Sequence, residues 1–110
     1  MTIDENKFDT LAEQTLNHFL DTIDDALGDI LDVDMDNGML TIKAESGAQY
    51  IINKHGPNRQ IWVSSPLSGA SHYAFDETRG GWTDTRDGES LPARLAGELS
   101  QLAGVALSLD

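Results

Sequence analysis

Residues 51–69 read IINKHGPNRQIWVSSPLSG, and this stretch decides the fold. Its Gly-Pro-Asn triplet at 56–58 is a strong turn signal. Before the turn, residues 49–53 are rich in aromatic and β-branched side chains, and after it residues 60–64 alternate between polar and apolar ones. The pattern therefore predicts two strands joined by a turn.

A tryptophan occupies a polar position in the second of these strands. If Ile61 and Val63 face the core, Trp62 points to the other face with Gln60 and Ser64, because successive side chains of a strand point to opposite faces. A large aromatic ring on a polar face calls for an explanation. A contact with a protein partner is one, and the alternative is that Trp62 covers part of the sheet and fixes the hairpin.

Helices are expected at both ends of the chain. Apolar residues recur at helical spacing over residues 5–27, and Gly28 follows as a stop signal. A second helix is expected to begin after Ser90, which suits an N-cap, and to end at Gly104. In the tail, large apolar residues recur at every second position, Val105, Leu107 and Leu109, and the tail is expected to lie in the groove between the two helices.

The region between the helices reads as a series of short strands. In the first of them Val33 and Met35 are expected to face inward, and Asn37-Gly38 marks a tight hairpin. The expected strands span residues 32–36, 39–43, 49–53, 60–64, 71–75 and 82–83. Residues 1–110 are thus predicted to form a single α+β domain, with two terminal helices on one face of an antiparallel sheet of about six strands.

Charge is distributed unevenly along the chain, whose net charge is −12. Residues 1–36 hold eleven of the 19 acids and one base, Lys7, whereas residues 46–75 contain no acid at all. This balance argues against nucleic acid as a partner, because phosphate binding needs a basic face. No apolar run is long enough to span a membrane. Cations or basic protein surfaces are the expected partners.

The acids of the first helix and first strand form the candidate cation site. Asp21, Asp24 and Asp25 share one helical face, because residues three and four apart are neighbours on a helix. We call the following set the acidic ridge: Asp21, Asp24, Asp25, Asp29, Asp32 and Asp34. Carboxylate oxygens suit hard cations, so weak binding of iron or another divalent ion at several positions is one reading. The other is a solvated face that keeps the protein soluble.

The open face of the sheet is the candidate docking site. It pairs a tryptophan with a polar, charge-poor rim, as transient protein contacts often do. We call the following set the docking face: Asn53, Lys54, Asn58, Arg59, Gln60, Trp62 and Ser64. Lys54, Asn58 and Arg59 are expected in the turn beside it.

The histidines and the serines suggest no chemistry of their own. His18 is expected to be a partly exposed helix residue, His55 a solvated turn residue and His72 an isolated strand residue, so that they form no transition-metal site. Ser64 and Ser65 have no recognisable partner base, and no nucleophile elbow, phosphate loop or dinucleotide fingerprint is present. The sequence therefore shows no catalytic constellation.

The same stretch resembles the signature of the frataxin family, including its bacterial CyaY-type members. The segments that carry the resemblance are Asn53-Lys54, Pro57-Asn58, Gln60-Ile61-Trp62, Ser64-Ser65-Pro66 and Ser68-Gly69. The likeness extends along nearly the whole chain, with an acidic first helix, short strands and a closing helix in the family's order. It implies two parallel helices packed on an antiparallel sheet.

The resemblance also implies a function. Frataxins bind iron, Fe²⁺ or Fe³⁺, on an acidic ridge that also docks on basic surfaces of the cysteine desulfurase, and the ridge acids lie in the matching region. Asn53 and Trp62 match family positions tied to contact with the desulfurase and the scaffold protein of iron–sulfur cluster assembly. We therefore expect a monomeric, non-enzymatic iron-binding adaptor. The acidic N-terminus, which does not look like a presequence, favours a bacterial cytoplasm over a mitochondrial matrix. The alternatives are a ferroxidase that stores iron in iron-induced oligomers, and an acidic binding module without a metal.

Two segments depart from the family pattern. His55-Gly56 stands where mitochondrial members usually have Gln-Thr, and residues 72–75 read His-Tyr-Ala-Phe in place of Arg-Tyr-Asp-Trp. The loss of that arginine changes the far edge of the docking face. His72 would keep a positive charge there that depends on pH.

Overall fold

The computed structural model describes residues 4–109, which form two helices and six strands. The first helix is followed by all six strands, and the second helix comes last. In chain order the elements are α1 (Glu5–Leu27), β1 (Leu31–Asp36), β2 (Met39–Ala44), β3 (Gln49–His55), β4 (Gln60–Ser65), β5 (Gly69–Asp76), β6 (Gly81–Asp84) and α2 (Leu91–Ala103).

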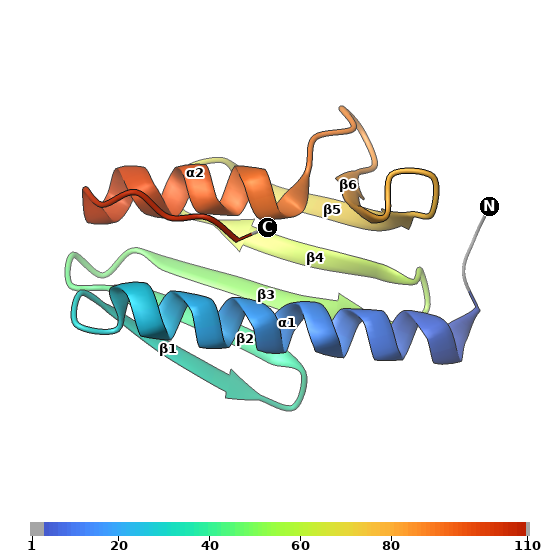
Figure 1. Cartoon of the computed structure of the whole chain (residues 1–110), viewed down its shortest axis with the longest axis horizontal. Helices are drawn as coiled ribbons and strands as arrows, with labels where there is room; N and C mark the ends of the chain where they lie inside the picture. The colour runs from blue at the N-terminus through green and yellow to red at the C-terminus, as the bar shows by residue number, and fades with distance from the viewer. Residues whose placement is uncertain (1–3, 110) are drawn as a thin grey trace.

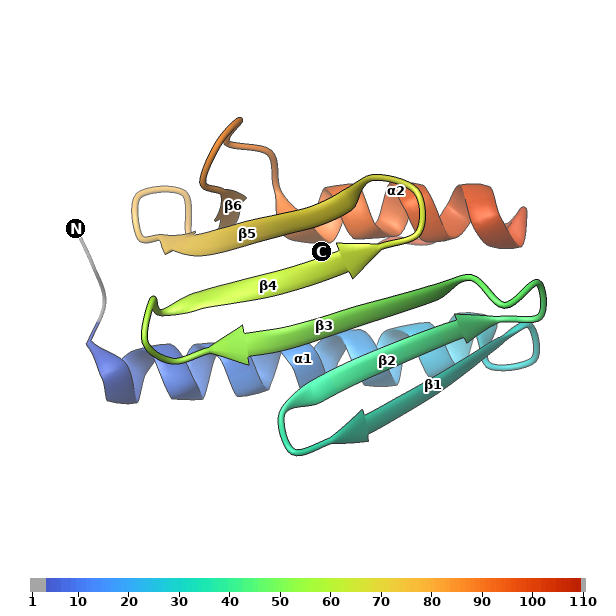
Figure 2. The same cartoon turned by 180° about the vertical axis from the view of Figure 1, so that it is seen from behind.

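The strands form one antiparallel sheet in the order β1-β2-β3-β4-β5-β6. Both helices cover one face of it and run side by side in the same direction (Figure 1). The other face carries no helix (Figure 2). The fold is therefore the expected α+β arrangement, in which one face of the sheet is covered and the other is open.

The hydrophobic core lies between the sheet and the helices. Alternation along the strands sends every second side chain into it, as the buried Leu40, Ile42, Ile52, Ile61 and Val63 show. The indole of Trp82 in β6 joins the sheet to α1: its Nε1 donates to Thr15 Oγ1 at 2.8 Å, and its ring meets those of Phe8 and Phe75 edge to face.

Most of the expected elements are confirmed. Helix α1 has the predicted bounds, Val33 and Met35 pack against the core, and Asn37 and Gly38 take the positive φ angles, 51° and 77°, of a tight hairpin. The fifth strand is longer than predicted and includes Gly69 and Ala70, because pairing with β4 orders residues whose own strand propensity is low.

The end of α1 differs from the expectation in one respect. Gly28 caps the helix in a right-handed conformation, with φ −60°, and not in the left-handed conformation that usually makes glycine a stop signal. The chain leaves the helix through a further bond, in which the N–H of Ile30 donates to the carbonyl of Leu27. Gly104, by contrast, ends α2 in the left-handed conformation, with φ 73°.

The C-terminal tail lies between the two helices, as predicted (Figure 1). Leu109 is buried, and its carbonyl accepts a hydrogen bond from His18 Nε2 of α1 at 3.1 Å. The N–H of Leu107 donates to Ser100 Oγ of α2. Val105 stays exposed, because the tail turns into the groove only after it.

A buried ion pair that the sequence does not indicate fixes the start of α2. Arg94 Nη1 donates to Asp84 Oδ2 at 2.7 Å and to the hydroxyl of Tyr73, and the Asp84 side chain is only 2% exposed. Burial by itself would raise the pKa of Asp84, but hydrogen bonds from the Arg86 N–H and the Arg94 guanidinium outweigh it and hold the pKa below its ordinary value. The pair therefore ties α2 to β6.

We expect Asp84→Asn to lower the free energy of unfolding by about 3 kcal/mol, because it leaves the Arg94 charge without its buried partner. The contribution of Asp84 is complete above its ordinary pKa of about 3.9 and is lost as the pH falls through the lower pKa of the folded state. Urea denaturation at neutral and at acidic pH measures both effects. Asp87→Asn is the control, because Asp87 also pairs with Arg94 but is exposed. Equal losses in the two variants would contradict the assignment.

Candidate functional site

The acidic ridge lies at one edge of the molecule. Its α1 members are exposed on the side of the helix turned away from the core, and Asp32 and Asp34 are exposed on the outward side of β1. Strand β1 is the edge strand and lies beside the C-terminal half of α1 (Figures 1 and 2). Asp29 lies in the connection between the two. The structure thus places the two sets of carboxylates at the same edge.

These carboxylates form no close ion pair within the described chain, although Lys43 of β2 lies opposite Asp32 across the β1–β2 pair. Within residues 4–109, no ridge acid has a lysine, arginine or histidine nitrogen within 4.0 Å. In the same part of the chain, no three His, Asp or Glu side chains are grouped so that they could hold a metal ion. The ridge carries separate, solvated carboxylates. A cation that binds there would have to draw two or more of them together.

The centre of the docking face is a row of residues that crosses the sheet. Pairing between the strands aligns Met39 of β2, Asn53 of β3, Trp62 of β4 and His72 of β5. All four belong to the face without helices, since their strand neighbours Leu40, Ile52, Ile61 and Tyr73 are the buried ones. Met39 and His72 are exposed, and Asn53 and Trp62 are half-buried.

The indole of Trp62 is held between two imidazoles. The ring of His55 lies parallel to it, with centroids 3.7 Å apart and an angle of 8°, and the ring of His72 stacks at 4.4 Å and 23°. His55 comes from β3 and His72 from β5, on either side of β4. Trp62 Nε1 donates to Gln60 Oε1 at 2.8 Å. The ring therefore has a fixed orientation on the open face.

Three predictions for this region need correction. Lys54 lies in β3 and not in the turn, and it points to the helices, where its Nζ is 3.1 Å from Glu13 Oε1 and 3.7 Å from Asp9 Oδ1. It is therefore no part of the open face. His55 is not a solvated turn residue and His72 is not isolated, since both stack on Trp62.

The other predicted residues lie as expected. Gln60 and Ser64 share the open face with Trp62, and Asn58 is exposed in the turn between β3 and β4. Arg59 ends that turn with φ 51°, a left-handed backbone that is uncommon for arginine, and its Nε is buried without a hydrogen-bond partner within the described chain.

Part of the sequence signature has a structural role. Ser65 is buried, and its Oγ donates to Glu98 Oε1 of α2 and accepts from the N–H groups of Leu67 and Ser68. Tyr50 of β3 donates to the same carboxylate oxygen at 2.9 Å. Burial raises the pKa of Tyr50, and the hydrogen bond to Glu98 adds to the rise. These bonds join the β4–β5 turn to α2.

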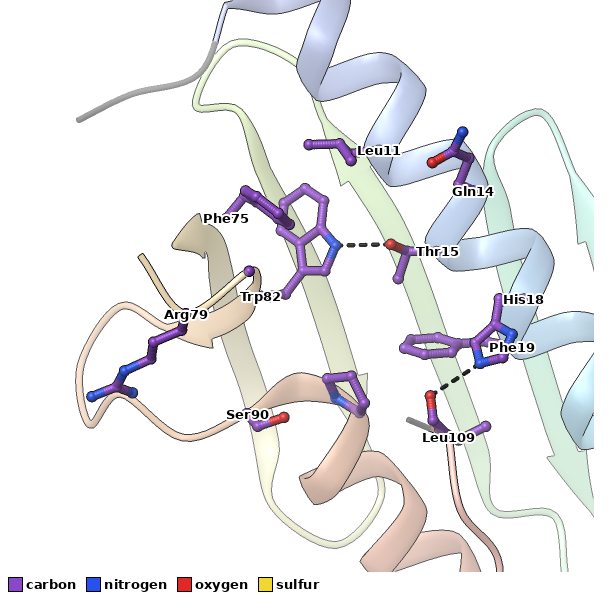
Figure 3. A pocket seen from close by; sticks show the side chains of 13 residues that line it. Leu11, Gln14, Thr15, His18, Phe19, Phe75, Arg79, Trp82, Ser90 and Leu109 are labelled. Carbon is purple, nitrogen blue, oxygen red and sulfur yellow. Dashed lines mark hydrogen bonds between the residues drawn. The ribbon is translucent and has the colours of Figure 1, made fainter. Parts of the chain in front are cut away.

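A groove of about 570 Å³ separates α1 from β6 and the start of α2 (Figure 3). The two hydrogen bonds drawn there, from Trp82 to Thr15 and from His18 to the Leu109 carbonyl, occupy polar atoms that line it. The Oγ of Ser90 accepts the N–H of Ala93 as a helix cap. Among the described residues of the groove, no serine is paired with a base as a nucleophile would need.

Residues 4–109 include no helix with both the length and the hydropathy that a membrane crossing requires.

Comparison with known proteins identifies relatives across the full chain. A family model described as a frataxin-like domain matches residues 1–105. The mitochondrial frataxin of Arabidopsis thaliana is 38% identical over 112 residues, which cover 98% of this chain and 60% of the plant protein. The iron–sulfur cluster assembly protein CyaY of Pseudomonas fluorescens SBW25 is 37% identical over 112 residues, which cover 100% of this chain and 98% of that protein.

Solved structures have the same fold. Frataxin from Psychromonas ingrahamii superposes with a TM-score of 0.86 at 24% identity and covers 98% of this chain and 99% of its own. A trimeric frataxin from Saccharomyces cerevisiae, described as complexed with ferrous iron, superposes with a TM-score of 0.75 at 30% identity and covers 94% of this chain and 89% of its own.

We expect Asp24→Asn to raise the melting temperature, by the equivalent of about 0.2–0.5 kcal/mol, because it removes repulsion within the ridge and a negative charge near the C-terminal end of α1. Added salt should act in the same direction. Glu5→Gln, with the same charge change at the other end of α1, should lower the melting temperature. Thermal unfolding followed by circular dichroism measures both, and a fall for Asp24→Asn would show that its carboxylate makes a structural bond.

Proposed function

Because this chain belongs to the frataxin family, we propose that it is a non-enzymatic, iron-binding adaptor of iron–sulfur cluster assembly. The observation that carries the proposal is the separation of two surfaces on one small fold. One edge concentrates exposed carboxylates, and the centre of the open face presents a fixed tryptophan. The acids of β1 lie only at the rim of that face.

The acidic ridge is the proposed iron site. Exposed carboxylates provide the oxygen ligands that Fe³⁺ and, with less preference, Fe²⁺ accept. Binding should be weak and shared among several positions, because the carboxylates are solvated and are not preassembled into a cage. The yeast frataxin complexed with ferrous iron supports iron as the cation. Other divalent cations would compete, since nothing in an all-oxygen set selects strongly among them.

The same ridge is proposed to dock on a basic surface of the cysteine desulfurase. A cluster of uncompensated negative charges accelerates association with a positive surface and fixes its orientation. The docking face would complete the contact, with Trp62 as the anchor and Asn53, Gln60 and Ser64 around it, against the desulfurase and the scaffold protein. A fixed aromatic ring is an effective anchor because little side-chain entropy is lost when it is covered.

We further propose that the protein acts as a monomer in the cytoplasm of a bacterium, since the bacterial CyaY relatives match over nearly their whole length.

Two variants separate the two surfaces. Asp21→Asn/Asp24→Asn/Asp25→Asn should weaken both iron binding and desulfurase binding, because it removes ligand oxygens and the attractive charge together. Trp62→Ala should weaken binding to the desulfurase–scaffold complex by about 30-fold and leave iron binding unchanged. Calorimetry with Fe²⁺ under anaerobic conditions and binding to the immobilised complex measure the two effects.

Matched controls account for charge and for apolar truncation. Glu5→Gln/Glu77→Gln/Glu89→Gln removes the same number of exposed charges away from the ridge, and Leu67→Ala truncates an exposed apolar residue in the β4–β5 turn. Both controls should bind iron and the complex as the wild type does. If the ridge and Trp62 variants also regulate the desulfurase as the wild type does, the proposed function is wrong.

A further inference from the structure

The stack of His55, Trp62 and His72 contains one exposed titratable group, the imidazole of His72. His72 is exposed and lies directly opposite Trp62 across the β4–β5 pair, with its ring 4.4 Å from the indole. His55 covers the indole from the neighbouring strand, and the indole N–H is already bonded to Gln60. A partner that reaches this spot therefore meets the imidazole nitrogens of His72 as the free polar atoms.

His55 has a different part in the stack. Its ring is half-buried, and its Nδ1 has no hydrogen-bond partner within residues 4–109. A protonated His55 would bury a charged N–H without an acceptor, which is costly. His55 therefore contributes its ring to the support of Trp62, and His72 is the imidazole of the stack that a partner can reach.

The basic side chains around the stack do not oppose a negatively charged partner. Lys54 of β3 faces the helices, where it is paired with acids. Arg59 lies in the turn that follows His55. After β6, the N–H of Thr85 donates to the His72 carbonyl, and Arg86 Nη2 donates to the Ala70 carbonyl, so Arg86 lies along the same strand.

Acids near the stack are few and are already engaged or distant. On the same face of β5 the acid is Asp76, whose carboxylate accepts from the N–H groups of Thr78 and Arg79 and is 3.7 Å from Arg79 Nε. In the segment after β6, Asp87 is paired with Arg94 at 2.7 Å. Asp36 of β1 ends the row that contains Trp62, but Met39 and Asn53 lie between them. Strand β4 contributes only neutral neighbours. The surroundings of His72 are therefore complementary to an incoming carboxylate.

Protonation would turn this site into a receptor. A histidine changes its charge between about pH 5 and pH 8. An imidazolium over an indole face gains a cation–π interaction, and it can donate a charge-assisted hydrogen bond to a carboxylate. Binding of a carboxylate and uptake of a proton then favour each other, so the affinity for such a partner rises as the pH falls through the imidazole range.

We propose that His72, stacked on Trp62, is a proton-dependent receptor for a carboxylate-bearing segment of the protein that docks on the open face. The proposal rests on the proposed function, because it requires that a partner occupies this face. It specifies that the partner segment is acidic. It also specifies that docking becomes tighter as the pH falls. The acidic ridge takes no part in this contact, because its negative charge is complementary to a basic surface.

The test compares binding to the purified desulfurase–scaffold complex of the same organism at about pH 6 and about pH 8. Wild-type protein should bind about fivefold tighter at the lower pH. His72→Gln should bind weakly with little dependence on pH, and His72→Arg should bind tightly at both pH values, because its charge is permanent. His55→Gln should bind less tightly but keep the dependence on pH.

His18→Gln is the matched control, because His18 is the third histidine of the chain and lies on the helix side. It should keep the wild-type difference between the two pH values, including any part that comes from titration of the partner. A difference of the same size in His72→Gln would overturn the receptor, as would tighter wild-type binding at the higher pH.

A second readout needs no partner. In an NMR titration of the free protein, the indole N–H resonance of Trp62 should move together with the ring resonances of His72, and His72→Gln should abolish that movement. If the indole N–H resonance stays fixed while the His72 resonances move, Trp62 and His72 do not respond together and the proposal is refuted. If the wild type binds the complex at neither pH, the proposed function fails. If it binds at both with equal affinity, docking stands and the receptor alone is refuted.

Discussion

The burial of one face of the sheet under α1 and α2 is the constraint on which the rest of the structure depends. Because strand side chains alternate, residues such as Ile61 and Val63 can fill the core only if Trp62 is turned to the open face. A slip of one residue in β4 would exchange the two sets. The exposed tryptophan is therefore a direct consequence of core packing, and the sheet gives it a rigid position. The same alternation in β1 turns Asp32 and Asp34 outward at the edge beside α1.

The two surfaces separate charge within a single small fold. The ridge gathers acids whose mutual repulsion costs stability, and the open face excludes acids from its centre. Acids with a structural role differ from the ridge acids, since the carboxylates of Asp84 and Glu98 each accept hydrogen bonds from defined partners. The contrast supports a functional reading of the ridge, because acids that serve the fold are paired and those of the ridge are not.

Local patterns predicted the elements and the two surfaces, and long-range contacts account for what they missed. The spacing of apolar residues in 5–27 was enough for α1, and the alternation of residues 60–64 was enough to place Trp62 on the open face. The pairing of Asp84 with Arg94 required the position of α2 over β6, which no local pattern contains. The stacking of His72 on Trp62 required the register between β4 and β5, and that register depends on a turn in which Ser65 is held by Glu98 of α2.

The central claim is that iron binds at the acidic ridge and not at the docking face. An anaerobic titration of isotope-labelled protein with Fe²⁺, followed through the backbone amide resonances, tests it most directly. The account predicts selective broadening at residues 21–36, with residues 53–64 unaffected at low iron. Equal broadening of both regions, or none at residues 21–36, would contradict it, and in the second case the ridge would be a charged docking surface without a metal.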